Sequence, residues 1–283
     1  MAGSPPKHVA LSIAGFDPCG AAGVLADLKT FAAHDCYGVA AIAAVTAQNT
    51  REIRRVVPVD STLLKLELQT LFDDVPVAGV KVGLLGSKRN MEVVAESLSA
   101  RRDAPIVIDP VLDSSIGAEF VTAQDLPAFV KLLLPLARVL TPSAEEAGRL
   151  LGTQVATVDD MKGAAKLLHE RGVPNVVVKG QHLERPCDVY FDGQDFEVFH
   201  SHRSEARTNR GVGCTFSSAI LVHLIEGKAV RESIVLAKAY LSQAISRGYP
   251  IGSGRNTLNH LYRFADAPVR VPGPDLVHEA PQS

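Results

Sequence analysis

Short apolar runs alternate with longer amphipathic stretches along most of the 283-residue chain. The apolar runs are short and continuous, as expected for strands buried on both faces of a sheet. They are Val9 to Ala14, Val39 to Val45, Gly79 to Val82, Ile106 to Ile108, Val139 to Leu140 and Asn175 to Val178. The helices predicted to connect them are Ala21 to Ala33, one capped by Asp60, Ser87 to Ala100, Asp125 to Leu134, Ala144 to Leu151 and Asp160 to Arg171.

This alternation is typical of repeated βα units. It predicts an α/β fold in which helices flank both faces of a central, mostly parallel sheet. In such folds ligands bind beyond the carboxyl ends of the strands.

The C-terminal part of the chain departs from this pattern. Val189 to Phe191 and Glu197 to Phe199 flank Asp192-Gly193 and predict a hairpin. Two helices, about Cys214 to Glu226 and Ala229 to Arg247, are expected after it. We therefore predict one domain over residues 8–264, with a disordered N-terminus at 1–7 and a loose, proline-containing tail at 265–283.

Composition and charge exclude several classes of protein. The formal net charge of -2 gives no electrostatic case for nucleic acid or an anionic membrane, and the local cluster of Arg51, Arg54 and Arg55 is interpreted as solvated surface. Apolar runs are too short to span a bilayer, and the first residues lack the apolar stretch of a signal peptide. Four cysteines show neither metal-ligand nor disulfide spacing. A reduced, cytoplasmic enzyme or binding protein is therefore expected.

A glycine-rich turn precedes the first of the two C-terminal helices, in the run Gly211-Val212-Gly213-Cys214-Thr215. Glycines there let backbone N–H groups converge, and the helix start adds partial positive charge, which suits phosphate oxygens. Most such turns merely connect elements. The helix field would lower the thiol pKa of Cys214, which could then accept a proton or contact a substrate hydroxyl. Packing of a small buried thiol is the alternative.

Several motifs together resemble the hydroxymethylpyrimidine/phosphomethylpyrimidine kinases of thiamine synthesis, within the ribokinase-like superfamily. The glycine run, continued by Phe216-Ser217-Ser218-Ala219, is similar to that family's Gly-Thr-Gly-Cys-Thr-Leu-Ser. The resemblance extends through nearly the whole chain to about Phe264. Its other motifs are Ile13-Ala14-Gly15-Phe16-Asp17-Pro18, Ala26-Asp27-Leu28-Lys29-Thr30-Phe31, Ala47-Gln48-Asn49-Thr50, Lys81-Val82-Gly83-Leu84-Leu85, Asp109-Pro110-Val111 and Val178-Lys179-Gly180.

The resemblance implies a ribokinase-like three-layer fold and ATP-dependent phosphorylation of 4-amino-5-hydroxymethyl-2-methylpyrimidine and its monophosphate. It implies that Gln48 reads the pyrimidine, because a carboxamide carries both an acceptor and donor hydrogens. It places Gly15, Asp27, Leu84 and Val111 around the substrate. Catalytic roles fall to Cys214, Gly211, Gly213 and Lys179, and Thr215 and Asp109 join Lys179 at the nucleotide. Relatives also imply a homodimer.

Each of these residues has a plainer interpretation. Gln48 can satisfy loop backbone, Asp27 can pair with a neighbouring lysine on the surface, and a lysine at a strand end such as Lys179 is usually exposed. Glu146 matches the glutamate of the family's Thr-Pro-Asn-x-x-Glu motif and is the candidate to hold Mg²⁺ through water. Ser143 and Glu146 also form a capping box, and the two roles can coexist.

Departures from the family pattern lie on the loops expected to face phosphate. Val212, Arg210 and Ser143 stand where the family has threonine, frequent histidine and asparagine, and Ser115 and Ile116 replace a lysine and a serine. Arg210 either adds positive charge to the site or projects into solvent. Two alternatives stay open: a pyridoxal or pyridoxine kinase of the same superfamily, and a catalytically impaired pyrimidine-binding sensor.

Overall fold

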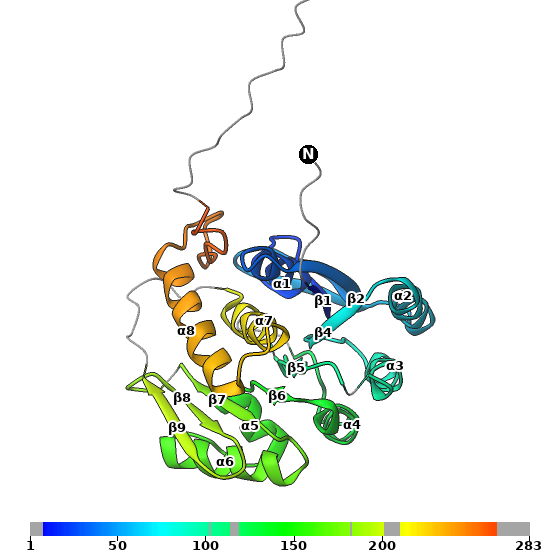
Figure 1. Cartoon of the computed structure of the whole chain (residues 1–283). Coiled ribbons are helices and arrows are strands. Elements are labelled where there is room, and N and C mark those ends of the chain that lie inside the picture. The colour runs from blue at the N-terminus through cyan, green and yellow to red at the C-terminus, as the bar shows by residue number, and fades with distance from the viewer. Residues whose placement is uncertain (1–7, 102, 114–118, 182, 201–209, 265–283) are drawn as a thin grey trace, which may run out of the picture.

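The computed structural model describes residues 8–101, 103–113, 119–181, 183–200 and 210–264. The two expected tails, at 1–7 and 265–283, and the substitutions at Ser115 and Ile116 lie outside these residues. Figure 1 shows a central sheet with helices packed on both of its faces, which confirms the predicted three-layer α/β architecture.

The described residues form a nine-stranded sheet in the order β3-β2-β1-β4-β5-β6-β7-β8-β9. Neighbouring strands run parallel in the central part of the sheet, which consists of β2, β1, β4, β5, β6 and β7. The edge strand β3 pairs antiparallel with β2, and β8 pairs antiparallel with β7. The hairpin predicted around Asp192-Gly193 is β8 and β9. The strands are β1 Val9–Phe16, β2 Tyr37–Gln48, β3 Ile53–Pro58, β4 Val77–Val82, β5 Ile106–Ile108, β6 Val139–Leu140, β7 Val176–Gly180, β8 Cys187–Phe191 and β9 Phe196–His200.

Helices cover the two faces of the sheet unequally (Figure 1). One face packs against α1 (Gly23–Ala32), α7 (Val212–Ile225) and α8 (Val230–Ser246). The other face packs against α2 (Ser61–Asp74), α3 (Lys88–Ser99), α4 (Leu126–Leu132), α5 (Ala144–Leu151) and α6 (Val158–Glu170).

Alternate residues of a central strand serve the two cores. Ile106 and Ile108 of β5 point into the core under the larger helical layer, and Val107 points into the other. All three side chains are buried, so the strand reads as a continuous apolar run rather than an alternating one. This is why short apolar runs located the inner strands correctly.

Helix starts follow the expected capping chemistry. The Asp60 carboxylate accepts the backbone N–H groups of Thr62 and Leu63 at the start of α2. Ser143 and Glu146 form the predicted capping box of α5.

The arginine cluster is exposed, as its interpretation as solvated surface expected, but Arg54 and Arg55 lie on β3, an edge strand that the sequence analysis did not predict and that pairs antiparallel with β2. One helix was wrong in detail. The helix expected over Asp125 to Leu134 is split into α4 and a 3-10 turn, Leu134–Leu136. Pro135 lacks an N–H group and cannot continue an α-helical hydrogen-bond pattern.

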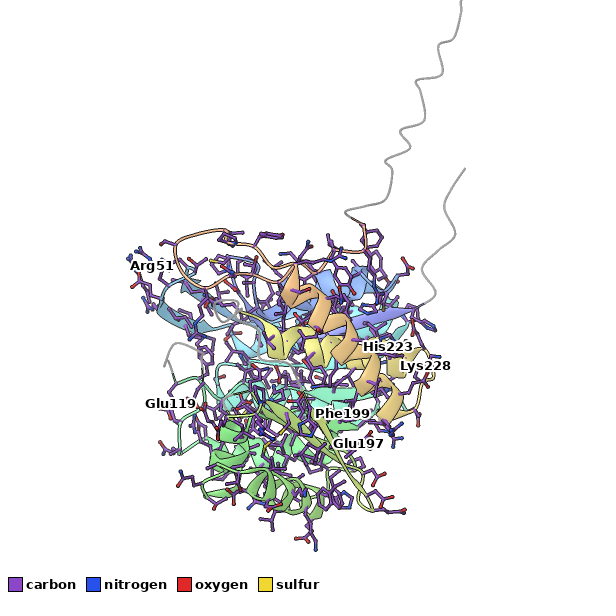
Figure 2. The ribbon with its side chains drawn as sticks, turned by 90° about the vertical axis from the view of Figure 1, so that its left-hand side faces the viewer. Arg51, Glu119, Glu197, Phe199, His223 and Lys228 are labelled. Atoms are coloured by element: carbon purple, nitrogen blue, oxygen red, sulfur yellow. The ribbon has the colours of Figure 1, made fainter. Side chains whose placement is uncertain are left out.

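The carboxyl ends of the parallel strands all lie on one side of the sheet, where β1 ends at Phe16 and β4, β5 and β7 lead into Gly83, Asp109 and Gln181. The N-terminus of α7 lies on this side, and its C-terminal turn, with His223, lies on the other. Figure 2 shows Arg51 and Glu119 on one side of the molecule, with His223 and Lys228 on the opposite side. In the described part of the chain, none of the helices combines the length and the apolar character needed to cross a membrane.

Candidate active site

A cavity of about 630 Å³ opens at the carboxyl ends of the parallel strands. It brings Gln48, at the end of β2, into the same cavity as Cys214, in the first turn of α7, as the family resemblance implies. Ten of the twelve residues proposed from the sequence line it: Gly15, Gln48, Leu84, Asp109, Val111, Glu146, Lys179, Gly211, Gly213 and Cys214.

Apolar groups form the walls beside Gln48. Gly15 lies so close to Leu84 that a Cβ at position 15 would come within 2.9 Å of the leucine Cδ2. Leu84 is 8% exposed, and Val111 lines the same cavity from the loop after β5. A flat ring can be held between such walls while a few polar groups fix its orientation.

The glycine turn has the conformation that an anion loop needs. Gly211 has φ 78°, in the left-handed region, and a Cβ there would lie 1.8 Å from the carbonyl oxygen of Ala21. Any other residue would displace the turn from the β1–α1 loop. Helix α7 begins at the next residue, so its unpaired N–H groups face the cavity.

Lys179 and Asp109 form a buried ion pair beside this turn, with Nζ 2.7 Å from Oδ1. A Cβ on Gly213 would lie 3.1 Å from both Lys179 Nζ and Asp109 Oδ2, so the absence of a side chain opens the pair to the helix start. Burial alone would lower the pKa of Lys179, but the charges of Asp109 and Glu146 outweigh it and raise that pKa. Lys179 is therefore a fixed cation at the cavity, not the solvent-exposed lysine of the plainer interpretation.

Glu146 lies next to this pair in a different electrostatic setting. Its Oε2 accepts the Ser143 N–H at 2.7 Å, which is half of the capping box. Burial, reinforced by the charge of Asp109, raises the pKa of Glu146 to about 7. The helix-capping role is thus present, and the carboxyl group still lines the cavity.

The acidic groups suit Mg²⁺ held through water rather than a closed protein cage. No cluster of three or more His, Cys, Asp or Glu residues that could hold a metal occurs among the residues described. Mg²⁺ usually binds through one or two carboxylates, retained waters and substrate phosphates. Asp109 and Glu146 provide two such carboxyl groups at the cavity wall, so the residues fit the ion.

The state of the Cys214 thiol differs from expectation. The helix start was expected to lower its pKa, but burial raises the pKa of Cys214 to about 11, against the opposing effects of the Lys81 charge and the Gly23 N–H. The thiol is therefore neutral near pH 7. It can donate or share a proton with a substrate hydroxyl, but it does not sit there as a thiolate.

Arg210, which the sequence analysis left undecided, points into the site. Its side chain is 6% exposed, and its Nη2 donates to Gln48 Oε1 at 2.5 Å. Sequence reasoning gave Arg210 no part in holding Gln48, because the two residues are 162 positions apart.

Asp27 does not line the cavity, which corrects both of its expected roles. Its carboxylate is fully buried and accepts hydrogen bonds from Ser12 at 2.6 Å, Lys81 at 2.9 Å and Ser218 at 2.9 Å. These contacts join β1, β4 and α7 to α1. The residue is neither in contact with substrate space nor a surface carboxylate.

Lys81 itself was missed, although the sequence carried a signal. It interrupts the apolar strand Val77–Val82, and a buried ammonium needs a partner. Burial alone would lower the pKa of Lys81, but Asp27 outweighs it and raises that pKa. Lys81 also lines the cavity, where its charge opposes the rise in the pKa of Cys214.

Thr215 is the second correction. It is fully buried in α7, and its Oγ1 lies 3.0 Å from Nε2 of His260. Its backbone N–H donates to the Gly211 carbonyl within the helix. Neither group remains for a nucleotide, so the family motif places this threonine in the scaffold of the site.

His260 should make stability depend on pH. Burial lowers its pKa to about 4, from 6.5. As the pH falls, His260 is therefore protonated near pH 6.5 in the unfolded chain but only near pH 4 in the folded chain. The free energy of unfolding decreases as the pH falls through that window. Between pH 7 and pH 5 the free energy of unfolding of wild type, relative to His260→Gln, should fall by about 2 kcal/mol. Urea titrations of both proteins at the two pH values measure this difference, and a constant difference would contradict it.

Comparison with known proteins places the chain among small-molecule kinases. The family model described as Phosphomethylpyrimidine kinase matches residues 17–259. A hydroxymethylpyrimidine/phosphomethylpyrimidine kinase from Aquifex aeolicus is 36% identical over 248 residues, which are 87% of this chain and 97% of that protein.

Pyridoxine and pyridoxal kinases are also similar to the chain. A pyridoxine kinase from Bacillus subtilis is 36% identical over 251 residues, 86% of this chain and 92% of that protein. The structure of pyridoxal kinase from Staphylococcus aureus in complex with AMP-PCP and pyridoxal superposes with a TM-score of 0.83 at 31% identity, covering 90% of this chain and 94% of that one.

Proposed function

Because the chain belongs to the phosphomethylpyrimidine kinase family, we propose that it transfers the γ-phosphoryl group of ATP to 4-amino-5-hydroxymethyl-2-methylpyrimidine and then to its monophosphate. The product of the two transfers is the pyrophosphate used in thiamine synthesis. One observation carries the proposal: Gln48 and the helix-start amides with Lys179 line the same cavity.

We propose that one end of this cavity binds the ring and the other end binds the phosphoryl group. Gln48 and the walls made by Leu84 and Val111 hold the ring, so that its hydroxymethyl group points toward Cys214. The amides at the start of α7 and the Lys179 ammonium stabilise charge on the phosphoryl group during its transfer. Phosphoryl transfer depends mainly on such positioning and charge stabilisation, for which this end of the cavity is suited.

Cys214 acts as a neutral hydrogen-bonding partner of the substrate hydroxyl in this proposal. Its raised pKa, about 11, makes a standing thiolate base unfavourable near neutral pH. A loose transition state needs little deprotonation of the attacking oxygen before the phosphoryl group is transferred, and the hydroxyl proton then passes to an oxygen of the transferred phosphoryl group. The second transfer needs no base at all, because the attacking phosphate oxygen is already ionised.

Mg²⁺ is proposed as the metal, bound by Asp109 and Glu146 through water and by the nucleotide phosphates. When bound, it neutralises phosphate charge. Lys179, which is hydrogen-bonded to Asp109 in the structure, would contact the same phosphates.

A pyridoxal or pyridoxine kinase is the second candidate, supported by the similarity to such enzymes at 36% identity and at a TM-score of 0.83. Both rings carry a hydroxymethyl group, so the phosphoryl-transfer end would serve either. Gln48 favours the pyrimidine, which offers an amino group beside a ring nitrogen. A pyridine ring has no amino group for this carboxamide to bind.

The proposal predicts a defined product pattern. With ATP and Mg²⁺, wild type should convert the pyrimidine to mono- and pyrophosphate, and Gln48→Ala should raise KM for the pyrimidine about tenfold with a smaller change in kcat, because one ring contact is lost. Chromatography of the products and initial rates, measured side by side with pyridoxal, provide the test. Preference for pyridoxal would establish the second candidate, and tight pyrimidine binding without ATP consumption would establish a sensor.

A homodimer and a cytoplasmic location complete the proposal. Val45 of β2 and its cross-strand partner Val57 of β3 are each 45% exposed at the edge of the sheet, an apolar pair suited to contact a second copy. All four cysteines are free thiols, which is typical of a reducing compartment.

A further inference from the structure

Arg210 connects the two ends of the cavity. It directly precedes Gly211 of the anion loop, and its backbone N–H donates to the carbonyl of Asn256 at 2.9 Å. Its side chain reaches the end of β2, where one guanidinium nitrogen donates to the backbone carbonyl of Asn49 and the other to Gln48 Oε1 at 2.5 Å. Arg210 is therefore held at three points, two of them through its guanidinium beside the ring-binding end.

This contact determines which way the carboxamide of Gln48 faces. A guanidinium has donors only, so the group that meets Arg210 must be the amide oxygen. The NH₂ group of Gln48 then lies on the other side of the amide carbon. A glutamine without such a partner could turn its amide by 180° and offer either group.

The charge of Arg210 is compensated by a nearby carboxylate. Asp17 Oδ2 lies 3.8 Å from the same Nη2, and both side chains are almost completely buried, at 6% and 2% exposure. The Asp17 carboxylate is itself fixed by the backbone N–H groups of Cys19, Ala21 and Ala22. Arg210 can therefore stay in place as a positioning group when a neutral ring enters.

We propose that Arg210 is a specificity-determining residue that locks the Gln48 amide with its NH₂ group toward the substrate, so that the pocket selects rings with a hydrogen-bond acceptor on that edge. This rests on the proposed function, since it concerns the same ring-binding site. The class it selects is the neutral aminopyrimidine, whose ring nitrogen beside the amino group accepts from Gln48. The remaining lone pair of Gln48 Oε1 can accept from the amino group.

The test compares two rings by calorimetry in the absence of ATP. One is 4-amino-5-hydroxymethyl-2-methylpyrimidine, and the other is its analogue with C–H in place of the ring nitrogen next to the amino group. Wild type should bind the pyrimidine about tenfold more tightly than the analogue, because the analogue leaves a donor of Gln48 unpaired. Arg210→Met should weaken binding of the pyrimidine about tenfold and change the affinity for the analogue by less than about threefold.

Two further variants separate this role from damage to the fold. Arg210→Lys keeps a donor and the charge and should recover part of the preference for the pyrimidine. In a Gln48→Ala background, Arg210→Met should have little further effect on that preference, because the group that it positions is gone. Arg255→Met is the matched control: Arg255 also lines the cavity, but in the described structure its side chain donates no hydrogen bond to Gln48, so the ratio of the two affinities should be unchanged.

If Arg210→Met weakened binding of both rings equally, the specificity role would be overturned and Arg210 would be a structural residue. An undiminished preference in that variant would overturn it as well. Failure of wild type to bind either ring is a different result: it would refute the proposed substrate itself, and the role of Arg210 with it.

Discussion

Replacing Lys179 by methionine is expected to lower kcat by about a hundredfold or more, close to the loss measured when one charge-stabilising contact is removed from an active site. Lys179 is the buried cation next to the helix-start amides, 2.7 Å from Asp109, and methionine keeps its length without the charge. The effect should fall on kcat more than on KM for the pyrimidine, because the lysine lies at the phosphate end. Steady-state kinetics with both substrates varied measure this division.

Lys228→Met is the matched control for this experiment. Lys228 is an exposed lysine at the opposite end of the molecule (Figure 2), paired with Glu232, and its loss should leave kcat within about twofold. Circular dichroism of Lys179→Met confirms that the variant is folded before its rate is interpreted. A folded variant with wild-type kcat would remove Lys179 from the proposed chemistry.

Replacing Lys81 by methionine is expected to destabilise the fold by about 3–5 kcal/mol, because it leaves the Asp27 carboxylate buried without its cation. Asp27 has no exposed surface and cannot be hydrated in place. Urea unfolding of wild type and variant gives the difference in the free energy of unfolding. Lys65→Met removes a lysine from an exposed pair with Glu96 and should cost less than about 1 kcal/mol.

A double variant tests whether Asp27 and Lys81 contribute to stability as a coupled pair. Adding Asp27→Asn to Lys81→Met removes the stranded charge, and asparagine can still contact Ser12 and Ser218. The double variant should therefore be more stable than the sum of the two single losses predicts. Additive losses, or a loss below about 1 kcal/mol in Lys81→Met, would show that the two residues do not form one electrostatic unit.

The layered fold followed from local patterns that the tertiary structure did not override. Inner strands such as β5 are buried on both faces, so an uninterrupted apolar run was a sufficient signal. The Asp60 cap and the Ser143–Glu146 capping box are interactions between near neighbours in the chain and could be predicted without the fold. β3 was missed because it is a short, largely exposed edge strand that mixes arginines with valines, and its identity depends on pairing with β2.

The candidate site was predictable as a set of residues, but several of their environments were not. Arg210 and Gln48 are 162 residues apart, and only the fold brings the guanidinium to the amide oxygen. The raised pKa of Cys214 reflects burial, which the helix-start argument did not include. Asp27 and Thr215 lie within matching motifs, yet both point into the packed interior, because a motif preserves scaffold residues as well as those that touch substrate.

Because Lys179 and Asp109 neutralise each other's charge, an anion that binds beside them must compete with this ion pair. An arriving anion gains the ammonium only by drawing it away from a carboxylate 2.7 Å distant. A single-charged anion has little to offer in that exchange, whereas a polyphosphate chain that also meets the helix-start amides makes several new contacts at once. For the proposed reaction, we therefore expect the Lys179–Asp109 ion pair to disfavour binding of small singly charged anions relative to a nucleotide.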